Sequence, residues 1–236
     1  MRKNYNFMPV GFPLFIILFV FLFLLFPLLI FLYTGGIVAA FSRLGFSPGT
    51  GFLLFVLILI GSTINIPVKE VKSKMPFVQD RIVNFFGIGY RIPVTVSEDI
   101  VVTINVGGAL IPIIISVYEL SRMLIAGHLF QILITVVAIT LVSIFCYIFA
   151  RPVKGVGIAI PFFIPPLITV LVAFLLARGN NAAMVAYISG TLGTLIGADV
   201  LNLNKVDGLG APVVSIGGAG TFDGIFITGI LSVLLV

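Results

Sequence analysis

Long runs of apolar residues constrain this chain more than any other feature. Stretches long enough to cross a bilayer recur along its 236 residues, and about 20 apolar residues in a helix span the hydrocarbon core. Charged residues make up only 9% of the chain, whereas a soluble domain carries about 25%. A soluble globule is therefore excluded, and the predicted fold class is an all-α integral membrane protein.

The runs predict about seven transmembrane helices in a single polytopic membrane domain, residues 1–236. They lie at residues 9–33, 49–68, 104–118, 129–150, 158–177 and 182–201, with a seventh ending at Val236. The first run is longer than the signal-peptide core of about 7 to 15 residues, so we expect it to remain as an anchor. Residues 69–99 form the predicted cytoplasmic loop, with a short β-like hairpin at 81–96 around Gly87 and Gly89.

The basic residues predict the orientation in the membrane. With the N-terminus inside, ten of the 13 lysines and arginines fall on the cytoplasmic side, and Arg43, Arg122 and Arg178 fall outside. This asymmetry follows the positive-inside rule. We therefore expect a multi-pass protein of the inner (plasma) membrane with a cytoplasmic N-terminus and an external C-terminus.

The net charge of +5 then indicates contact with anionic lipid head groups rather than nucleic acid. The single cysteine, Cys146, lies inside the fourth run, so no intramolecular disulfide can form. No Cys/His cluster or phosphate-binding loop is present in the sequence, and no metal or cofactor is predicted. The sequence leaves the oligomeric state open.

Two Gly-rich breaks interrupt the apolar pattern, at residues 101–112 (VVTINVGGALIP) and 213–224 (VVSIGGAGTFDG). Each is a β-like run, a Gly-Gly pair and an apolar helix. Non-helical backbone at membrane depth is tolerated only where protein or a water-filled cavity satisfies its polar groups. Matching VVTI with VVSI and GGA with GGA predicts a parallel repeat, in which two paired strands start two helices side by side. The alternative is coincidence in a chain with 25 glycines.

Two acidic residues near the ends of predicted spans, Asp199 and Asp223, are the candidate catalytic pair. An ionisable group inside a span is by default a functional hypothesis. Two carboxylates held close share a proton and can act as general acid and base on a peptide bond, which predicts an intramembrane aspartic-type hydrolase (peptidase). The structural alternative places Asp223 in a first helical turn capped by Thr221, and Asp199 at the interface near Lys205.

A second hypothesis makes the same region a cation- or proton-coupled transporter or channel. Broken helices supply free carbonyls and helix ends, and asparagine oxygens and an aspartate complete the site. Its binding residues for an ion or substrate are Asn105, Gly107, Gly108, Asn202, Ser215, Gly217, Gly218 and Thr221. A third hypothesis is a non-enzymatic role in membrane assembly. The partners expected are the bilayer and either a peptide or a small cation.

Other polar residues receive structural interpretations. Glu98, Asp99 and Glu119 flank the third run and are expected at the interface. Ser62, Thr63 and Asn65 are expected to satisfy neighbouring helix ends before Pro67, and the alternative is that they extend an ion pathway.

Three segments together carry a resemblance to a known family. They are INVGGALIP at residues 104–112, IGADVLNL at 196–203 and SIGGAGTFDGIF at 215–226. The chain from about Lys69 onward resembles a prokaryotic membrane-protein family catalogued as domain of unknown function 1614. The resemblance implies a prokaryotic integral membrane protein and no particular activity. GAGTFDG is also distantly similar to the Gly-x-Gly-Asp motif of presenilin-type and prepilin-type peptidases, with Thr221 and Phe222 inserted before the aspartate.

Overall fold

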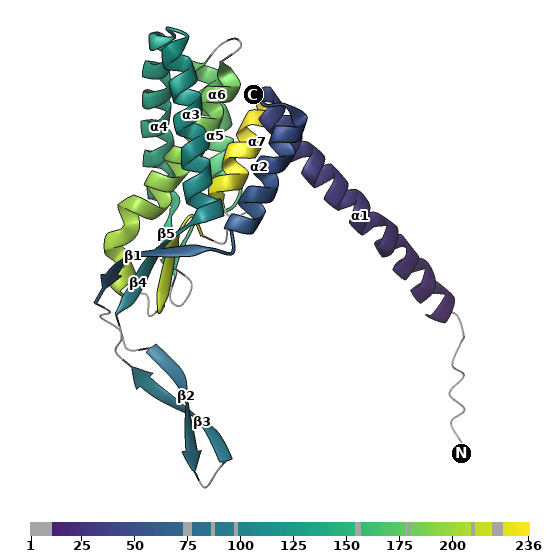
Figure 1. Cartoon of the computed structure of the whole chain (residues 1–236), viewed down its shortest axis with the longest axis vertical. Helices are drawn as coiled ribbons and strands as arrows, with labels where there is room; N and C mark the ends of the chain where they lie inside the picture. The colour runs from purple at the N-terminus through teal and green to yellow at the C-terminus, as the bar shows by residue number, and fades with distance from the viewer. Residues whose placement is uncertain are drawn as a thin grey trace, which may run out of the picture.

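The computed structural model describes residues 11–72, 77–85, 88–96, 99–153, 157–177, 179, 181–208, 211–218 and 224–236. Most of these residues are helical (Figure 1). The α-helices are α1 (Gly11–Arg43), α2 (Pro48–Gly61), α3 (Ile111–Ile125), α4 (Leu129–Phe149), α5 (Ile164–Leu176), α6 (Ala182–Thr194) and α7 (Gly224–Leu235). A π-turn, η1 (Val106–Leu110), precedes α3; a second, η2 (Leu195–Asp199), and a 3-10 helix, η3 (Val200–Gly208), continue α6.

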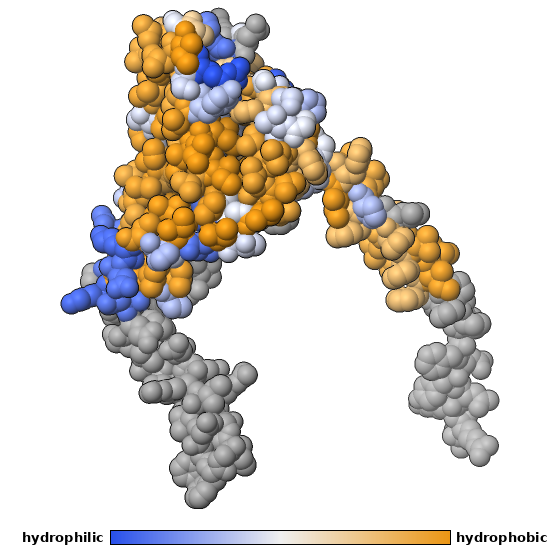
Figure 2. All heavy atoms as spheres, viewed as in Figure 1, coloured by the Kyte–Doolittle hydropathy of each residue, from blue (hydrophilic) through white to orange (hydrophobic). Residues whose placement is uncertain are grey.

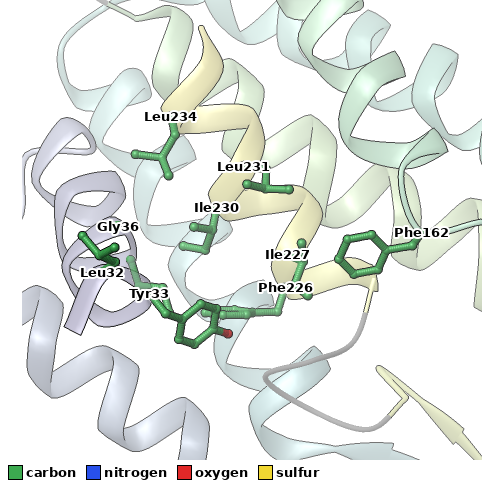
Figure 3. Close-up of a pocket in the computed structure, with 10 residues that line it drawn as sticks. Leu32, Tyr33, Gly36, Phe162, Phe226, Ile227, Ile230, Leu231 and Leu234 are labelled. Carbon is green, nitrogen blue, oxygen red and sulfur yellow. The ribbon is translucent and has the colours of Figure 1, made fainter. Parts of the chain in front are cut away.

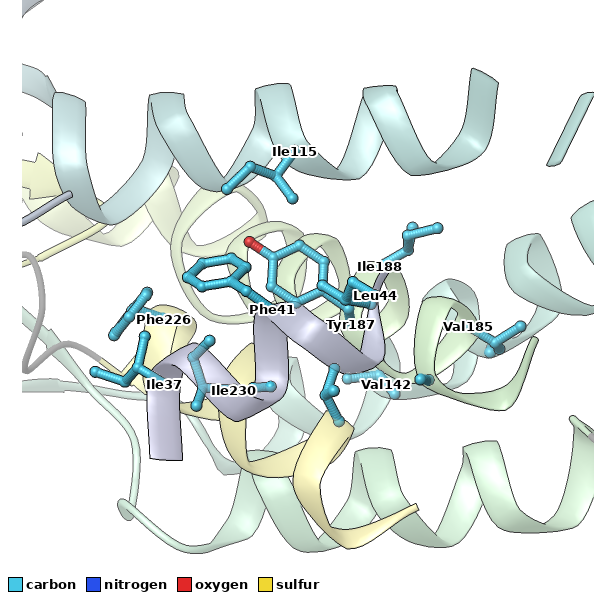
Figure 4. Packing of buried hydrophobic residues seen from close by; sticks show 14 of the residues in the cluster. Ile37, Phe41, Leu44, Ile115, Val142, Val185, Tyr187, Ile188, Phe226 and Ile230 are labelled. Atoms are coloured by element: carbon cyan, nitrogen blue, oxygen red, sulfur yellow. The ribbon is translucent and has the colours of Figure 1, made fainter. Parts of the chain in front are cut away.

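Helix α6 is the centre of the bundle and contacts α3, α4, α5 and α7. Its glycines allow this close approach, because a Cβ added at Gly193 would lie 2.7 Å from the Val142 side chain of α4. The main core, which includes Phe41, Tyr187 and Phe226, forms around α6 (Figure 4). Small residues at helix crossings are a usual basis of packing in membranes, and Gly190, Gly193 and Gly197 all lie against neighbouring helices.

Helix α1 joins the bundle only through its C-terminal part. Ile37 and Phe41 of α1 and Leu44 directly after it are buried, whereas the preceding turns of α1 are exposed and extend away from the other helices (Figure 1). The α1 surface and the bundle surface are both strongly apolar, and hydrophilic residues gather at the end of the molecule that carries the first strand (Figure 2). At the opposite end, Arg43 donates hydrogen bonds to the last carbonyls of α7, at 2.5 Å to Val233 and 2.9 Å to Leu234.

A three-stranded sheet holds the two Gly-rich breaks together. Its strands are β1 (Asn65–Val71), β4 (Ile100–Asn105) and β7 (Val213–Ile216), in the order β1-β4-β7. Strand β4 pairs with β7 in parallel, and Thr103 lies opposite Ser215. The pairing of VVTI with VVSI predicted from the sequence is therefore confirmed. The helices that follow, α3 and α7, start at the same end of the bundle. They do not lie side by side as predicted, because α6 packs against both of them and they make little direct contact with each other.

Two smaller sheets complete the described structure. Strands β2 (Phe77–Phe85) and β3 (Ile88–Val96) form an antiparallel hairpin that extends away from the bundle (Figure 1). This confirms the predicted hairpin, which starts earlier than residue 81, and its side of the membrane stays a prediction. Strands β5 (Arg151–Val153) and β6 (Gly157–Ala159) form a short ribbon between α4 and α5.

The described residues contain four helical stretches long and apolar enough to cross a membrane: Phe15–Arg43, Val106–Ile125, Leu129–Phe149 and Ala182–Asp207. Helices α2, α5 and α7 are shorter, and the 14 residues of α2 reach only about 21 Å. The predicted runs at residues 49–68 and 158–177 were too long because part of each is not α-helical. Residues 65–68 belong to β1, residues 158–159 to β6, and α7 begins only at Gly224. The count of seven spans stays a prediction.

We predict that Arg43→Ala destabilises the protein by about 1–3 kcal/mol, because it removes charge-assisted hydrogen bonds to the α7 carbonyls. Thermal unfolding of the purified protein in detergent measures the effect. Arg151→Ala is the matched control, since Arg151 is exposed in β5. Equal melting temperatures for the two variants would show that Arg43 does not hold the end of α7.

Candidate functional site

The two breaks touch each other through glycine. Gly217 has a φ of +85°, and a Cβ added there would lie 2.7 Å from the Ala109 nitrogen and 2.8 Å from the Gly108 carbonyl carbon. A side chain at position 217 is therefore opposed by both the backbone conformation and the available space. We call this contact of Gly217 with Gly108 and Ala109 the break junction.

The first break is a capped π-turn. The Asn105 Oδ1 accepts a hydrogen bond of 2.7 Å from the Gly108 amide, and Nδ2 donates to the Ser62 carbonyl at 2.8 Å. Gly107 lies against the end of α2, where an added Cβ would overlap the Ile58 carbonyl oxygen. Asn105 is 1% exposed, and its side chain satisfies backbone groups that the change from strand to helix leaves unpaired.

A row of polar side chains crosses the three strands beside this cap. Asn105 Nδ2 donates to Asn65 Oδ1 at 3.2 Å, and the Ser215 hydroxyl donates to the same oxygen at 2.8 Å. The row joins β4, β1 and β7, so Ser215 of the second break is linked to Asn105 of the first. The hydroxyls of Ser62 and Thr63 bond the carbonyls of the last α2 turn, which confirms their expected role at a helix end. For Asn65 the prediction is wrong, because Asn65 lies in β1 and its side chain belongs to the polar row.

Asp199 brings a carboxylate to the second break. It ends the π-turn η2, is partly buried, and its Oδ2 accepts a 2.8 Å hydrogen bond from the Gly217 amide. A backbone amide stabilises the ionised form of the carboxylate that it bonds. π-turns inside helices occur often at functional sites, and here the π-turn places Asp199 against the junction of the two breaks.

The second break does not repeat the conformation of the first. Gly107, Gly108 and Ala109 belong to a π-turn, whereas Gly217 and Gly218 have φ values of +85° and +51° and form a turn. The predicted match of GGA with GGA is therefore wrong in conformation, because both glycines of the second pair are left-handed. The repeat extends over the strands only.

Asn202 caps the C-terminal end of η2. Its Nδ2 donates to the carbonyls of Gly197 and Ala198, both at 3.0 Å, and its Oδ1 accepts from Lys205 Nζ at 2.6 Å. The ammonium of Lys205 already occupies the oxygen that the transport hypothesis gave to a cation. In this structure Asn202 therefore has a structural role.

The other predicted catalytic residue, Asp223, and Thr221 lie outside the described residues. The distance between the carboxylates of Asp199 and Asp223 stays a prediction. Among the described residues, no three His, Cys, Asp and Glu side chains come together as metal ligands would.

Glu119 differs from its sequence prediction. Its side chain is 0% exposed and forms an ion pair with Arg122 at 3.0 Å, whereas the sequence placed it at the interface. The predicted span ended at Tyr118, but the helix continues to Ile125 and carries Glu119 inside the bundle. The i, i+3 spacing of Glu119 and Arg122 on one apolar helix is the signal that identifies this pair.

An apolar groove of about 390 Å³ lies between α1 and α7 (Figure 3). Leu32, Tyr33 and Gly36 line it from α1, and Phe226 and Ile230 are among the residues that line it from α7. The lining suits hydrocarbon, and Asp199 is not part of it. A smaller pocket of about 190 Å³ at the sheet is lined in part by Lys69, Val102 and Asp207.

Comparison with known proteins identifies the family. The family model described as "Protein of unknown function (DUF1614)" matches residues 59–235. The chain belongs to this family. No curated protein and no solved structure matches it. The match begins in α2 and includes both Gly-rich breaks, Asp199 and Glu119 of this DUF1614 protein.

We predict that Gly217→Ala damages the break junction of this DUF1614 protein. Gly179→Ala is the matched control, because Gly179 has a φ of +82° and no atom within 4 Å of an added Cβ. Placing an alanine at a positive φ lowers the free energy of unfolding by about 1 kcal/mol in both variants. In Gly217→Ala the overlap with Ala109 lowers it by about 1 kcal/mol more. Thermal unfolding in detergent measures the difference. Equal stability of the two variants would contradict the close contact at the junction.

Proposed function

We propose that this DUF1614 protein is a membrane transport protein coupled to a proton or small cation, with Asp199 as the ion-binding carboxylate. The observation that carries the proposal is the hydrogen bond between Asp199 Oδ2 and the Gly217 amide at the break junction. This bond places a charged group where two strands, a π-turn and a glycine turn meet. Broken helices with a carboxylate are a common form of ion site in transporters.

The bond supplies a physical coupling between charge and conformation. Ionised Asp199 holds the Gly217 amide, whereas a bound proton or cation weakens the negative charge that strengthens this bond. Gly217 and Gly218 both have positive φ, so the backbone at the second break has the conformational freedom of glycine. Ion binding at Asp199 thereby changes how firmly η2 holds the second break.

The lysines at one end of the bundle indicate which end lies in the cytoplasm. Lys69 and Lys205 lie at the end that carries the sheet, and the positive-inside rule puts this end in the cytoplasm. We propose that the N-terminus lies there too and that the three shorter helices, extended by strands and turns, complete seven crossings. The lysines then contact anionic lipid head groups.

The hydrolase hypothesis shares Asp199 but requires a second carboxylate from Asp223. The hydrolase hypothesis predicts that the protein cleaves a peptide, and the ion hypothesis does not. The same set of variants therefore separates the two.

The test compares wild type, Asp199→Asn and Asp207→Asn, purified in detergent. Asp207 is the control because it lines the sheet pocket, and Gly108, Ala109 and Gly217 do not. Melting temperatures are measured across pH and with Na⁺, K⁺ and Mg²⁺. We expect wild type and Asp207→Asn to show the same dependence of melting temperature on pH or on one cation, and Asp199→Asn to lose the part of that dependence that Asp199 causes. A ligand at 100 times its dissociation constant stabilises by about 2.7 kcal/mol.

A response that is the same in all three proteins, or absent from wild type, would contradict the ion site. The same samples are incubated with fluorogenic peptides. Cleavage by wild type that is abolished in Asp199→Asn would replace the transport proposal with the hydrolase hypothesis.

A further inference from the structure

The only histidine of the chain shares one pocket with both methionines that the structure describes. The sequence contains one histidine and five methionines, and three of the methionines lie outside the described residues. His128, Met123 and Met184 all line an open pocket of about 340 Å³. This pocket therefore brings together every imidazole and every thioether of the described part of the chain.

The pocket lies at the end of the bundle opposite the sheet (Figure 1). Met123 belongs to the last turns of α3, His128 follows that helix, and Met184 lies in the first turn of α6. Helices α3 and α6 pack against each other, which brings the two methionines to the same place. Asp199 lies beyond the other end of α6, so the pocket is separate from the break junction.

The C-terminal cap of α3 holds His128 beside Met123. Gly127 has a φ of +73°, and its amide donates to the Leu124 carbonyl at 3.0 Å. The His128 amide donates to the Met123 carbonyl, also at 3.0 Å. These are the two hydrogen bonds of a Schellman motif, in which a left-handed glycine ends the helix and the next residue lies against the last turn. The backbones of His128 and Met123 are therefore fixed next to each other.

The sulfur of Met123 keeps its lone pairs for a ligand. Met123 is 1% exposed, and its Sδ lies 4.0 Å from Thr135 Oγ1 of α4. The Thr135 hydroxyl donates instead to the Gln131 carbonyl at 2.7 Å, so its proton is not used by the sulfur. Met184 is only partly buried, and the three rotatable bonds of methionine allow its sulfur to adjust to a bound ion.

Two thioethers and an imidazole form a soft, neutral ligand set. Thioether sulfur selects Cu(I) among the biological metals, and imidazole also binds copper. The charged residue of the pocket is Arg122, which forms an ion pair with Glu119 at 3.0 Å. Because this pair is neutral as a whole and the three ligands carry no charge, the pocket suits a monovalent soft ion better than a hard divalent one.

We propose that this pocket binds Cu(I) through the Sδ atoms of Met123 and Met184 and one ring nitrogen of His128. Binding forms three coordination bonds from neutral ligands to the ion. No electron is transferred, and no bond within the protein breaks. The site goes beyond the ion site proposed at Asp199 and does not rest on it.

Copper binding is measured on the full chain in detergent, in a Cys146→Ser background that removes the only cysteine. Ascorbate under anaerobic conditions keeps the copper as Cu(I), and the chelator bicinchoninate competes for it. We expect this protein to retain one Cu(I) per chain against the chelator. X-ray absorption of the loaded protein is expected to show both sulfur and nitrogen bound to copper, and this measurement needs no further variant.

Two variants in the same background assign the ligands. Met184→Leu and His128→Gln each remove one ligand, and we expect each to weaken Cu(I) binding by about tenfold or more. Leucine conserves the volume of methionine, and neither position is fully buried. Ile125→Leu is the matched control, because Ile125 lines the same pocket and carries no sulfur.

Three results would overturn the copper site. They are the failure of the Cys146→Ser protein to retain Cu(I), an absorption spectrum without sulfur, and equal Cu(I) affinities of Met184→Leu and Ile125→Leu. Equal affinities would mean that Met184 only fills space in the pocket. Asp199→Asn is expected to keep Cu(I) binding, so this proposal and the proposed function fail independently.

Discussion

The structure depends on one constraint, which is that non-helical backbone inside an apolar bundle has to find its hydrogen bonds within the protein. The two Gly-rich breaks both contain non-helical backbone, and the parallel pairing of β4 with β7 provides hydrogen bonds to both of them at once. Asn105 then caps the π-turn after β4, and Asp199 bonds the amide of Gly217 after β7. In each break, backbone polar groups are thus satisfied by a polar side chain as well as by strand pairing.

The same constraint explains why a charged group lies at the junction. An amide at a glycine turn can be satisfied by a neutral acceptor, and a carboxylate makes a stronger bond whose strength depends on its charge. Asp199 therefore links protonation or cation binding to the backbone of the second break. Helix α6 leads through η2 to Asp199.

Sequence reasoning predicted the strands better than the helices. VVTI and VVSI carry an alternation that matches over four residues, so their pairing could be inferred from the chain alone. The conformations of the two GGA segments could not, because glycine permits both a π-turn and a left-handed turn, and tertiary contacts decide between them. Glu119 was misplaced for a similar reason, since hydropathy falls at Glu119 and Arg122 although the helix continues. A hydropathy average does not show that Arg122, on the same helix, pairs with Glu119.

The central claim, that the two breaks form one junction through in-register parallel strands, is tested most directly by disulfide crosslinking. In a Cys146→Ser background, Thr103→Cys with Ser215→Cys joins residues that lie opposite each other in β4 and β7. Thr103→Cys with Val213→Cys moves the partner by about 6.6 Å along the strand, which with about 4.8 Å between the strands gives a Cα separation of about 8 Å. This is beyond the separation of about 7 Å that a disulfide tolerates. The account predicts a crosslink in the first pair and not in the second. No crosslink in the first pair, or equal crosslinking in both, would contradict it.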